Sequence, residues 1–568
     1  MRLQLLVFCT LLPLARSAAA DETPRAVPLV GRVVNVQRQP VAGIEVRLSV
    51  VERGGERREL ESVSRADGWF VLAVPSRGVR SVGPTLVLER RHYRSSSVRL
   101  DADQVKALEA GRPVSLGELP IERRKTAAFW VTVAVFLLMM VLIGATQMHN
   151  ALAALLGASL LLGVSALGQL ISPDLVVFTF NDALAAVDWN VVFLIMGMMM
   201  VIAVVEGTGV FRWLAFFAYK SSGGRLWKLM TILMAITAVS SALLDNVTTM
   251  LLVTPITIRI ALAIDVDPLT LLFPEVLAAN VGGLSTMVGT PTNILIASYS
   301  GISFSAFLLN LTPGVVLALA GLWGYCRLRF KRQLAARDGE RSEGLLQRLE
   351  QGAAIAQPGH LRKSGWVGLG MLVLFIGGES LHITPALVAL LGATALLVWI
   401  RPNVEEMIEA VDWTTLIFFI TLFMVVGALQ VVGLIDQIAL WVSYMVGHSQ
   451  LLAMVVITWM AALISTVIPN IPFTATMLPV IGYLSSTMPG VDPRSLYFCL
   501  AVGAAMGGNG SLVGASANLV TAGIAERSGY PITFGHFLRV GFPALLVTVS
   551  LAFAWLLLRF MVLGGGGA

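Results

Sequence analysis

The sequence contains few charged residues for its length. Charged side chains account for only 13% of the 568 residues, whereas hydrophobic residues account for 56%. The mean hydropathy is correspondingly high, at +0.80. A soluble enzyme of this length needs a more polar composition, so that class of protein is excluded. The composition predicts a polytopic membrane protein whose membrane region is all-α.

Cysteine, histidine and nucleotide-binding motifs are also scarce. The three cysteines are Cys9, Cys326 and Cys499, so the exported segment described below has no disulfide framework, CxxC motif or cysteine-based zinc site. None of the six histidines pairs with another at metal-ligand spacing. No GxxxxGK[ST] loop is present, so coupling to ATP would need a separate subunit. We therefore expect no enzyme activity and no cofactor.

Long apolar runs dominate the chain after residue 126. The runs 127–146, 151–171, 191–205, 367–377, 386–400 and 537–558 mostly approach or reach the length of about 20 residues that spans a bilayer as a helix. The net charge of +6 could suggest a nucleic-acid partner. The basic residues instead cluster in two segments between spans, 212–228 and 327–363, which the positive-inside rule places in the cytoplasm.

The first 120 residues differ from the rest. Residues 1–20 combine an early arginine, a short apolar core and a small-residue ending, which predicts a signal peptide cleaved near Ala20, with an uncleaved anchor as the alternative. Residues 25–120 alternate strand and turn patterns, which predicts an extracytoplasmic β-sandwich. The spacing of Gly31, Pro40, Gly43 and Gly68-Trp69-Phe70 resembles the carboxypeptidase regulatory-like, transthyretin-like accessory domains.

The membrane part repeats itself. The segment 151–162 has a counterpart at 386–397, and the tripeptide "VDW" occurs at 187–189 and at 411–413. "SALLDNVTTMLLVTPI" pairs with "STVIPNIPFTATMLPVI", which aligns Asn246 with Asn470. "GGLSTMVGTPTN" pairs with "GGNGSLVGASAN", which aligns Asn293 with Asn518. We expect a first repeat at 127–330, a basic cytoplasmic linker at 331–363 and a second repeat at 364–562.

Counting spans from an exported β domain predicts that the repeats are inverted. The segment 229–263 then forms a re-entrant hairpin that enters from the cytoplasm, and 451–488 forms one that enters from outside. The glycine-rich segments interrupt two crossing helices beside the hairpin tips. Because non-helical backbone at membrane depth must be covered by protein or line a cavity, these four elements predict a binding site near the bilayer midplane.

The polar residues of these elements suit a small ion. Hydroxyl and amide groups with exposed carbonyls suit a cation such as Na⁺, whereas hydroxyls, amides and helix N-termini suit an anion. For any one Asn, Thr or Gly the alternative is ordinary helix packing. The candidate substrate- and ion-binding residues are Asp245, Asn246, Thr248, Thr249, Ser285, Thr286, Gly289, Thr292, Asn293, Asn470, Thr474, Thr476, Asn509, Ser511, Gly514, Ser516 and Asn518.

Two acids of the first repeat, Asp245 and Glu275, stand out in its apolar segments. An acid in the middle of the membrane is costly, so Asp245 is a functional candidate, with a neutral, hydrogen-bonded acid as the alternative. Glu275 follows Pro274 early in the next crossing helix, where it could lie near the cytoplasmic surface, and it ranks below Asp245.

These residues carry a resemblance to a known family. "SALLDNVTTMLLVTPITIR", "NVGGLSTMVGTPTNILIAS", "PNIPFTATMLPV" and "GGNGSLVGASANLVTAGIAERSGYPITF" closely resemble the ion-transporter superfamily. This superfamily includes the P-protein, arsenite-permease and sodium/proton antiporter group, and more distantly the citrate and dicarboxylate/sodium symporters.

The resemblance implies a homodimer of inverted repeats in the inner cell membrane, with elevator-like alternating access. In the symporter branch each hairpin carries a Ser-Asn-Thr signature, for which the nearest positions are Asn246 with Thr248 and Asn470 with Thr474. It also implies possible Na⁺ sites at Asn246, Gly289, Asn470 and Gly514.

Two departures from the family pattern reduce the local negative charge. The second hairpin reads Pro469-Asn470 where the P-protein-like pattern has Asp-Asn, and the first glycine-rich segment has Thr290 where that pattern has an acid. Both departures favour an anion somewhat.

Three functions remain open from the sequence. The leading hypothesis is a secondary active transporter of a small anion, such as citrate, a dicarboxylate or an arsenite-like oxyanion, driven by a Na⁺ or H⁺ gradient. The second is a Na⁺/H⁺ antiporter in which Asp245 titrates. The third, a remote alternative, is a receptor in which the β domain binds a ligand or partner and the membrane part signals.

Overall fold

The computed structural model describes residues 26–35, 38–51, 57–75, 84–144, 148–335, 357–378, 380–447, 449–488 and 491–563. The chain divides into two compact units, Met1–Lys125 and Thr126–Ala568. The expected signal segment 1–20 and much of the expected linker 331–363 lie outside the described residues.

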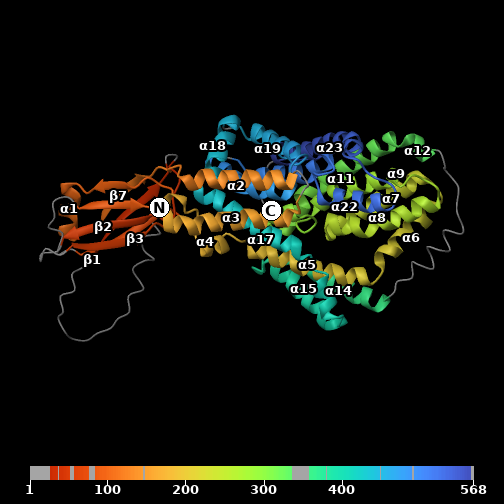
Figure 1. The fold of residues 1–568 in the computed structure, drawn as a ribbon, viewed down its shortest axis with the longest axis horizontal. Coiled ribbons are helices and arrows are strands. Elements are labelled where there is room, and N and C mark those ends of the chain that lie inside the picture. The colour runs from red at the N-terminus through yellow and green to blue at the C-terminus, as the bar shows by residue number, and fades with distance from the viewer. Residues whose placement is uncertain are drawn as a thin grey trace. The chain divides into compact units, whose positions relative to one another are not determined.

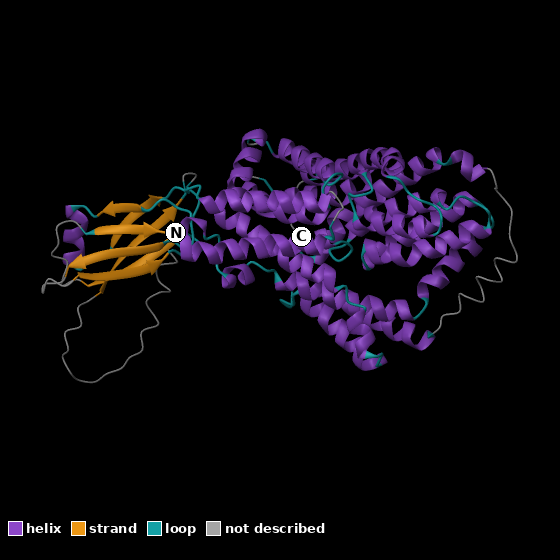
Figure 2. Ribbon diagram, viewed as in Figure 1, coloured by secondary structure: helices purple, strands orange, loops and turns teal. Residues whose placement is uncertain are grey.

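The described residues of the N-terminal unit form two β-sheets and one short helix (Figure 2). One sheet has the strand order β4-β1-β7 and the other the order β3-β2-β5-β6. The β1–β7 pair is parallel and all other pairs are antiparallel. The elements are β1 (Ala26–Val34), β2 (Glu45–Val51), β3 (Arg57–Val63), β4 (Trp69–Pro75), β5 (Thr85–Glu89), β6 (Ser96–Arg99), α1 (Ala102–Glu109) and β7 (Val114–Pro120).

Alternating apolar side chains build the core of this unit. In β4 the residues Phe70, Leu72 and Val74 are buried, while the residues between them are exposed. Period-two burial is what a strand with one covered face requires. A Cβ atom at Gly31 would lie 2.7 Å from the Phe70 ring, so only glycine leaves room for this ring.

The second unit is helical. Its first half contains α2 (Ala127–Gly144), α3 (Asn150–Ile171), η2 (Pro173–Leu175), α4 (Phe180–Ala185), α5 (Trp189–Gly207), α6 (Val210–Ser222), α7 (Leu226–Leu243), α8 (Asn246–Ala263), α9 (Leu269–Gly282), η3 (Gly283–Ser285), α10 (Pro291–Ser300), α11 (Phe304–Arg329) and α12 (Lys331–Ala335). Its second half contains α14 (Pro358–Gly377), α15 (Pro385–Ile400), α16 (Val404–Glu409), α17 (Trp413–Val432), α18 (Leu434–Val446), α19 (Gln450–Ile464), α20 (Asn470–Thr487), α21 (Pro493–Gly507), η4 (Gly508–Gly510), α22 (Ser516–Arg527), α23 (Phe534–Leu557) and η5 (Leu558–Val562).

Eight helices among the described residues are long and apolar enough to cross a membrane. Small residues let two of them, α5 and α17, pack closely against neighbouring segments. A Cβ at Gly197 of α5 would lie 2.8 Å from the Ala389 backbone of α15, and one at Gly427 of α17 would lie 2.5 Å from the Ala186 side chain. Close backbone approach over small residues is the usual basis of helix association in membranes. Figure 1 shows α5, α14 and α15 running side by side.

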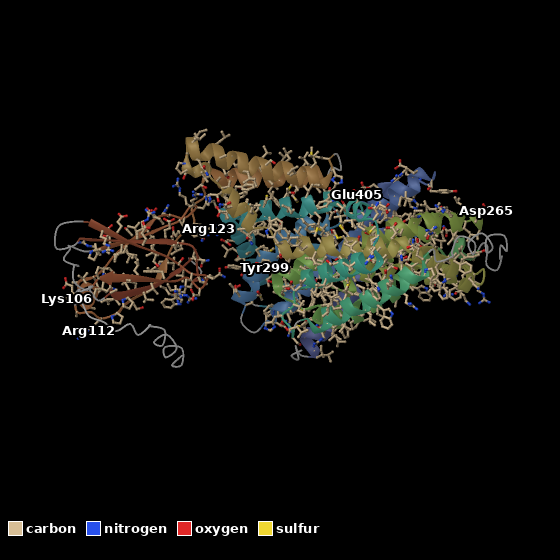
Figure 3. All side chains as sticks on the ribbon, turned by 90° about the horizontal axis from the view of Figure 1, so that it is seen from below. Lys106, Arg112, Arg123, Asp265, Tyr299 and Glu405 are labelled. Atoms are coloured by element: carbon tan, nitrogen blue, oxygen red, sulfur yellow. The ribbon has the colours of Figure 1, made fainter. Side chains whose placement is uncertain are left out.

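Helical geometry is interrupted at four places, which separate α7 from α8, α9 from α10, α19 from α20 and α21 from α22. α7 and α8 are joined directly through Leu244 and Asp245, without an intervening loop. In Figure 3, Asp265 in the loop before α9 lies at one end of the helical unit, and Tyr299 at the end of α10 lies towards the other end. The segment from α9 to α10 therefore runs along the unit.

Both cysteines in the described helices are buried, at positions 326 and 499, with exposed fractions of 0%. The described residues contain no group of three or more His, Cys, Asp or Glu side chains that could hold a metal ion.

Candidate functional site

A cavity of about 460 Å³ lies where the interrupted helices meet α3, α5 and α17. Most of the helices that border this cavity do so with their N-terminal residues. Within the described part of the chain, the first residues or N-caps of six helices line it or directly precede a lining residue: α3, α8, α10, α17, α20 and α22. A helix N-terminus carries a partial positive charge and, where no side chain caps it, unpaired N–H groups, so this convergence favours negative charge in the cavity.

Asp245 and Thr248 form the polar tip between α7 and α8. Asp245 is the N-cap of α8, and its Oδ1 accepts a hydrogen bond from the Thr248 backbone N–H at 2.8 Å. Its Oδ2 accepts a second bond from the Thr248 hydroxyl at 2.6 Å. Both side chains line the cavity. The carboxylate is therefore held by its own helix, in a form that suits a charged acceptor.

The break between α9 and α10 is closed by Asn293. The Asn293 Nδ2 donates to the carbonyls of Gly283 at 3.2 Å and Thr286 at 2.7 Å. The Thr286 hydroxyl donates to the Ala242 carbonyl at the end of α7. A Cβ at Gly289 would lie 2.4 Å from the Gly283 carbonyl oxygen, so this position admits only glycine. The segment is thereby fixed in a non-helical path.

The break between α21 and α22 makes the same bonds. The Asn518 Nδ2 donates to the carbonyls of Gly508 at 2.7 Å and Ser511 at 2.9 Å. The Ser511 hydroxyl donates to the Thr466 carbonyl, which follows α19. A Cβ at Gly514 would lie 2.8 Å from the Ser465 carbonyl oxygen. The residues that the sequence aligned thus occupy corresponding roles.

Asn280 connects these elements and was not among the sequence candidates. Its Oδ1 accepts from Asn246 Nδ2 at 2.9 Å. Its Nδ2 donates to Asn509 Oδ1 at 3.0 Å and to Asn518 Oδ1 at 2.9 Å. The only sequence signal was an amide inside an apolar helix, which by itself is usually a packing contact. In the structure it ties the tip of α8 to the second break.

The remaining candidates divide by position. Ser516 lines the cavity. Asn470 is half-buried at the first residue of α20, next to the lining residue Ile471. Thr249 and Thr474 are fully buried, with hydroxyls that have no partner among the described residues.

Three further candidates bond within their own segments. Ser285 donates to Gly282, Thr476 donates to Pro472, and Thr292 shares a bond with Thr290. The structure therefore brings Asp245, Thr248 and Ser516 to the cavity and places most of the others in the shell behind it.

Several cavity residues come from helices that the sequence did not implicate. Asp412 caps α17 and accepts from the backbone N–H groups of Thr414 and Thr415. Glu206 and His149 also line the cavity. The repeated "VDW" tripeptide contained Asp412, and this repetition was the one signal that could have marked it. No Lys or Arg is among the described lining residues.

Comparison with known proteins identifies a family for the chain. The model of the citrate transporter family CitMHS matches residues 134–503. An uncharacterized transporter of Mycobacterium tuberculosis is 38% identical over 435 residues, which cover 76% of this chain and 99% of that protein. The human P protein is 31% identical over 600 residues, which cover 92% of this chain and 70% of that protein.

Among solved structures, the Neisseria gonorrhoeae protein MtrF, described as belonging to a class of antimetabolite efflux pumps, aligns with a TM-score of 0.50 and 12% identity. The alignment covers 76% of this chain and 98% of that chain, and it concerns the fold alone. The family match and the relatives confirm the resemblance seen in the sequence. The chain therefore belongs to the CitMHS citrate transporter family and is a multi-pass membrane transporter, not an enzyme.

Proposed function

We propose that the chain is a secondary active transporter of a small anion, of the citrate, dicarboxylate or arsenite type, driven by a Na⁺ or H⁺ gradient. The main support is the convergence of helix N-termini on one cavity. Aligned N–H groups at membrane depth bind anionic substrate groups in discontinuous-helix transporters.

Two of these N-termini are free of side-chain caps. Asp245, Asp412, His149 and Thr290 cap α8, α17, α3 and α10. Pro469 and Ala515, which precede α20 and α22, provide no side-chain hydrogen bond. A carboxylate or oxyanion oxygen would supply the missing acceptors. We place the anion against the start of α20 and α22, with Asn470 and Ser516 beside it.

The carboxylates of the cavity require a cation with this anion. Asp245, Asp412 and Glu206 line the cavity, and the described lining contains no Lys or Arg to balance them. An anion would be repelled unless a cation entered with it. We keep the Na⁺ candidates Asn246 with Gly289 and Asn470 with Gly514. We add the Asn293 Oδ1 as a candidate oxygen for the Na⁺ site of Asn246 and Gly289, because it is buried and has no partner among the described residues.

The proposed mechanism is elevator-like alternating access by a homodimer. In it, α7–α8 and α19–α20 are re-entrant hairpins of inverted repeats, and they move with both interrupted helices against α3, α5 and α17. The matching bonds of Asn293 and Asn518 support the repeats. We also propose that residues 25–120 form an extracytoplasmic β-sandwich.

Citrate counterflow in proteoliposomes tests the proposal. Vesicles loaded with unlabelled citrate should take up labelled citrate without an ion gradient, and a Na⁺ or H⁺ gradient should drive net accumulation. Asp245→Asn and Asn470→Ala should each reduce uptake at least about tenfold, which corresponds to about 1.4 kcal/mol. Thr476→Val, whose hydroxyl bonds only to its own helix, is the matched control. Uptake by both site variants at the wild-type rate would remove these residues from the proposal.

The carboxylates of the cavity also favour a second candidate, a Na⁺/H⁺ antiporter in which Asp245 titrates. In this case an imposed Na⁺ gradient should change the internal pH of vesicles in the absence of citrate, arsenite or succinate. The antiporter would replace the anion transporter if this pH change occurred and none of the three anions showed counterflow.

A further inference from the structure

Glu275 is a carboxyl group buried in the helical unit, outside the cavity. Its exposed fraction is 0%, and it is not among the residues that line the cavity. It lies on α9, directly after Pro274. The sequence left open a place near the cytoplasmic surface, and in the structure the side chain is buried within the protein.

The Glu275 carboxyl group is only half satisfied. The Thr257 hydroxyl on α8 donates to Oε1 at 2.8 Å. Oε2 is buried and has no hydrogen-bond partner among the described residues, and no ion pair reaches the group there. At Asp245, by contrast, both oxygens accept a bond. Hydrogen bonds therefore reach both oxygens of Asp245 but only one oxygen of Glu275.

No charged residue on the helices packed against α9 forms an ion pair with Glu275 among the described residues. Arg259 lies two residues from Thr257 but is exposed, and the His536 ring packs against Phe273 with 5.0 Å between ring centroids. The titratable and charged residues on these helices are Lys228 on α7, Arg259 on α8, Tyr325, Cys326, Arg327 and Arg329 on α11, Arg494, Tyr497 and Cys499 on α21, Glu526 and Arg527 on α22, and His536 and Arg539 on α23.

We infer that Glu275 is a proton-binding site of the transporter, which holds a proton on Oε2 in the conformation described and releases it to water in another. An isolated charge in a dry membrane bundle is far costlier than the neutral acid. Proton binding forms one O–H bond and release breaks it, with no redox change. As a site of proton coupling, this inference rests on the proposed function.

Two further buried hydroxyls on α8 separate this site from the cavity. Thr249 and Thr254 lie on α8 between Thr257 and the cavity residue Thr248, and neither hydroxyl has a partner among the described residues. Proton coupling is assigned to Glu275 rather than to Asp245 because Glu275 Oε2 has no hydrogen-bond partner among the described residues, whereas both Asp245 oxygens accept a bond.

Infrared spectroscopy on the purified full chain tests the proton itself, without reference to any substrate. At neutral pH the wild type and the control Asp245→Asn should both show the carbonyl stretch of a protonated carboxyl group, and Glu275→Gln should lack it. An unchanged band in Glu275→Gln would overturn the inference.

Citrate transport in proteoliposomes then tests coupling. Glu275→Gln should keep citrate counterflow within about twofold of the wild type, yet lose the accumulation driven by an imposed pH gradient. The coupling role would be overturned if Glu275→Gln accumulated citrate normally in response to a pH gradient. It would also be overturned if the folded variant lost both counterflow and accumulation. Absence of citrate counterflow in the wild type would instead count against the proposed substrate, and the infrared result would then decide on Glu275 alone.

Thr257→Val provides a second variant that keeps the acid. The hydroxyl of Thr257 stabilises the charged carboxylate, so its removal should make Glu275 hold the proton more tightly. The pH at which the infrared band is half lost should therefore rise, and the pH dependence of citrate uptake should shift in the same direction. A static structural acid would shift only its infrared midpoint and would leave the pH dependence of citrate uptake unchanged. An unchanged or lower infrared midpoint, or an unchanged pH dependence of uptake, would overturn the inference even if Glu275→Gln failed to fold.

Discussion

The two glycine-rich breaks share their backbone hydrogen bonds but differ in one side chain. In the second break, Asn518 Oδ1 accepts from Asn280. In the first, Asn293 Oδ1 has no donor among the described residues, because the residue that the repeat aligns with Asn280 is Ala505. The second break is thus tied by side chains to the first half, whereas the first break keeps a free oxygen. Duplicated backbone frames can therefore serve two different tasks.

The largest loss of stability should come from adding a methyl group at the closely packed glycine of either break. A Cβ at Gly289 would lie 2.4 Å from a backbone oxygen, and one at Gly514 would lie 2.8 Å from one. We expect Gly289→Ala to destabilise by more than about 3 kcal/mol and Gly514→Ala by about 1–3 kcal/mol. Thermal melting in detergent would measure both, with Gly324→Ala, which meets nothing within 4 Å, as the control. If both variants melted at the wild-type temperature, the backbone at Gly289 and Gly514 would not be constrained as described.

Removing the connecting amide should have the next largest effect. Asn280→Ala removes the hydrogen bonds to Asn246, Asn509 and Asn518, each worth about 1 kcal/mol net. We expect a lower melting temperature and at least tenfold slower citrate counterflow. Ala505→Asn changes the residue that the repeat aligns with Asn280, and it should lower the melting temperature less because no existing bond is lost. If Ala505→Asn lowered stability and counterflow as much as Asn280→Ala, altered packing would explain both variants.

The two closing asparagines should differ in kind. Asn518→Ala removes bonds to Gly508, Ser511 and Asn280, and it should cost about 1 kcal/mol more stability than Asn293→Ala. Asn293→Ala should instead raise the Na⁺ concentration needed for half-maximal citrate uptake. A titration of uptake against Na⁺ for both variants would show this, and an equal Na⁺ dependence would argue against a cation at Asn293.

The smallest effect should come from Thr476→Val. Its hydroxyl bonds to the Pro472 carbonyl one turn earlier and reaches neither break. We expect a change in stability within about 0.5 kcal/mol and unchanged citrate uptake. A loss of transport in this variant would place Thr476 in the site after all.

The sequence predicted the parts of the molecule that depend on local pattern. The apolar runs predicted the membrane helices, and the paired motifs predicted that Asn293 and Asn518 would have corresponding roles. The cavity lining was harder to predict, because Asp412, Glu206 and His149 come from helices whose sequences are ordinary. Asn280 was missed because its importance depends on three partners, two of which lie more than 200 residues away. Contacts between distant segments leave no periodic signal.

Because the native thiols of the helical unit are buried, a thiol reagent can be directed to a single cysteine introduced into the cavity. Cys326 and Cys499 are fully enclosed by protein, and Cys9 falls within the expected signal segment. A cysteine introduced at Thr414, on the wall of the cavity, would face water while the two enclosed thiols stayed shielded. With Cys9 replaced by serine, a membrane-impermeant maleimide added to one side of sealed vesicles would report which side the cavity opens to during turnover.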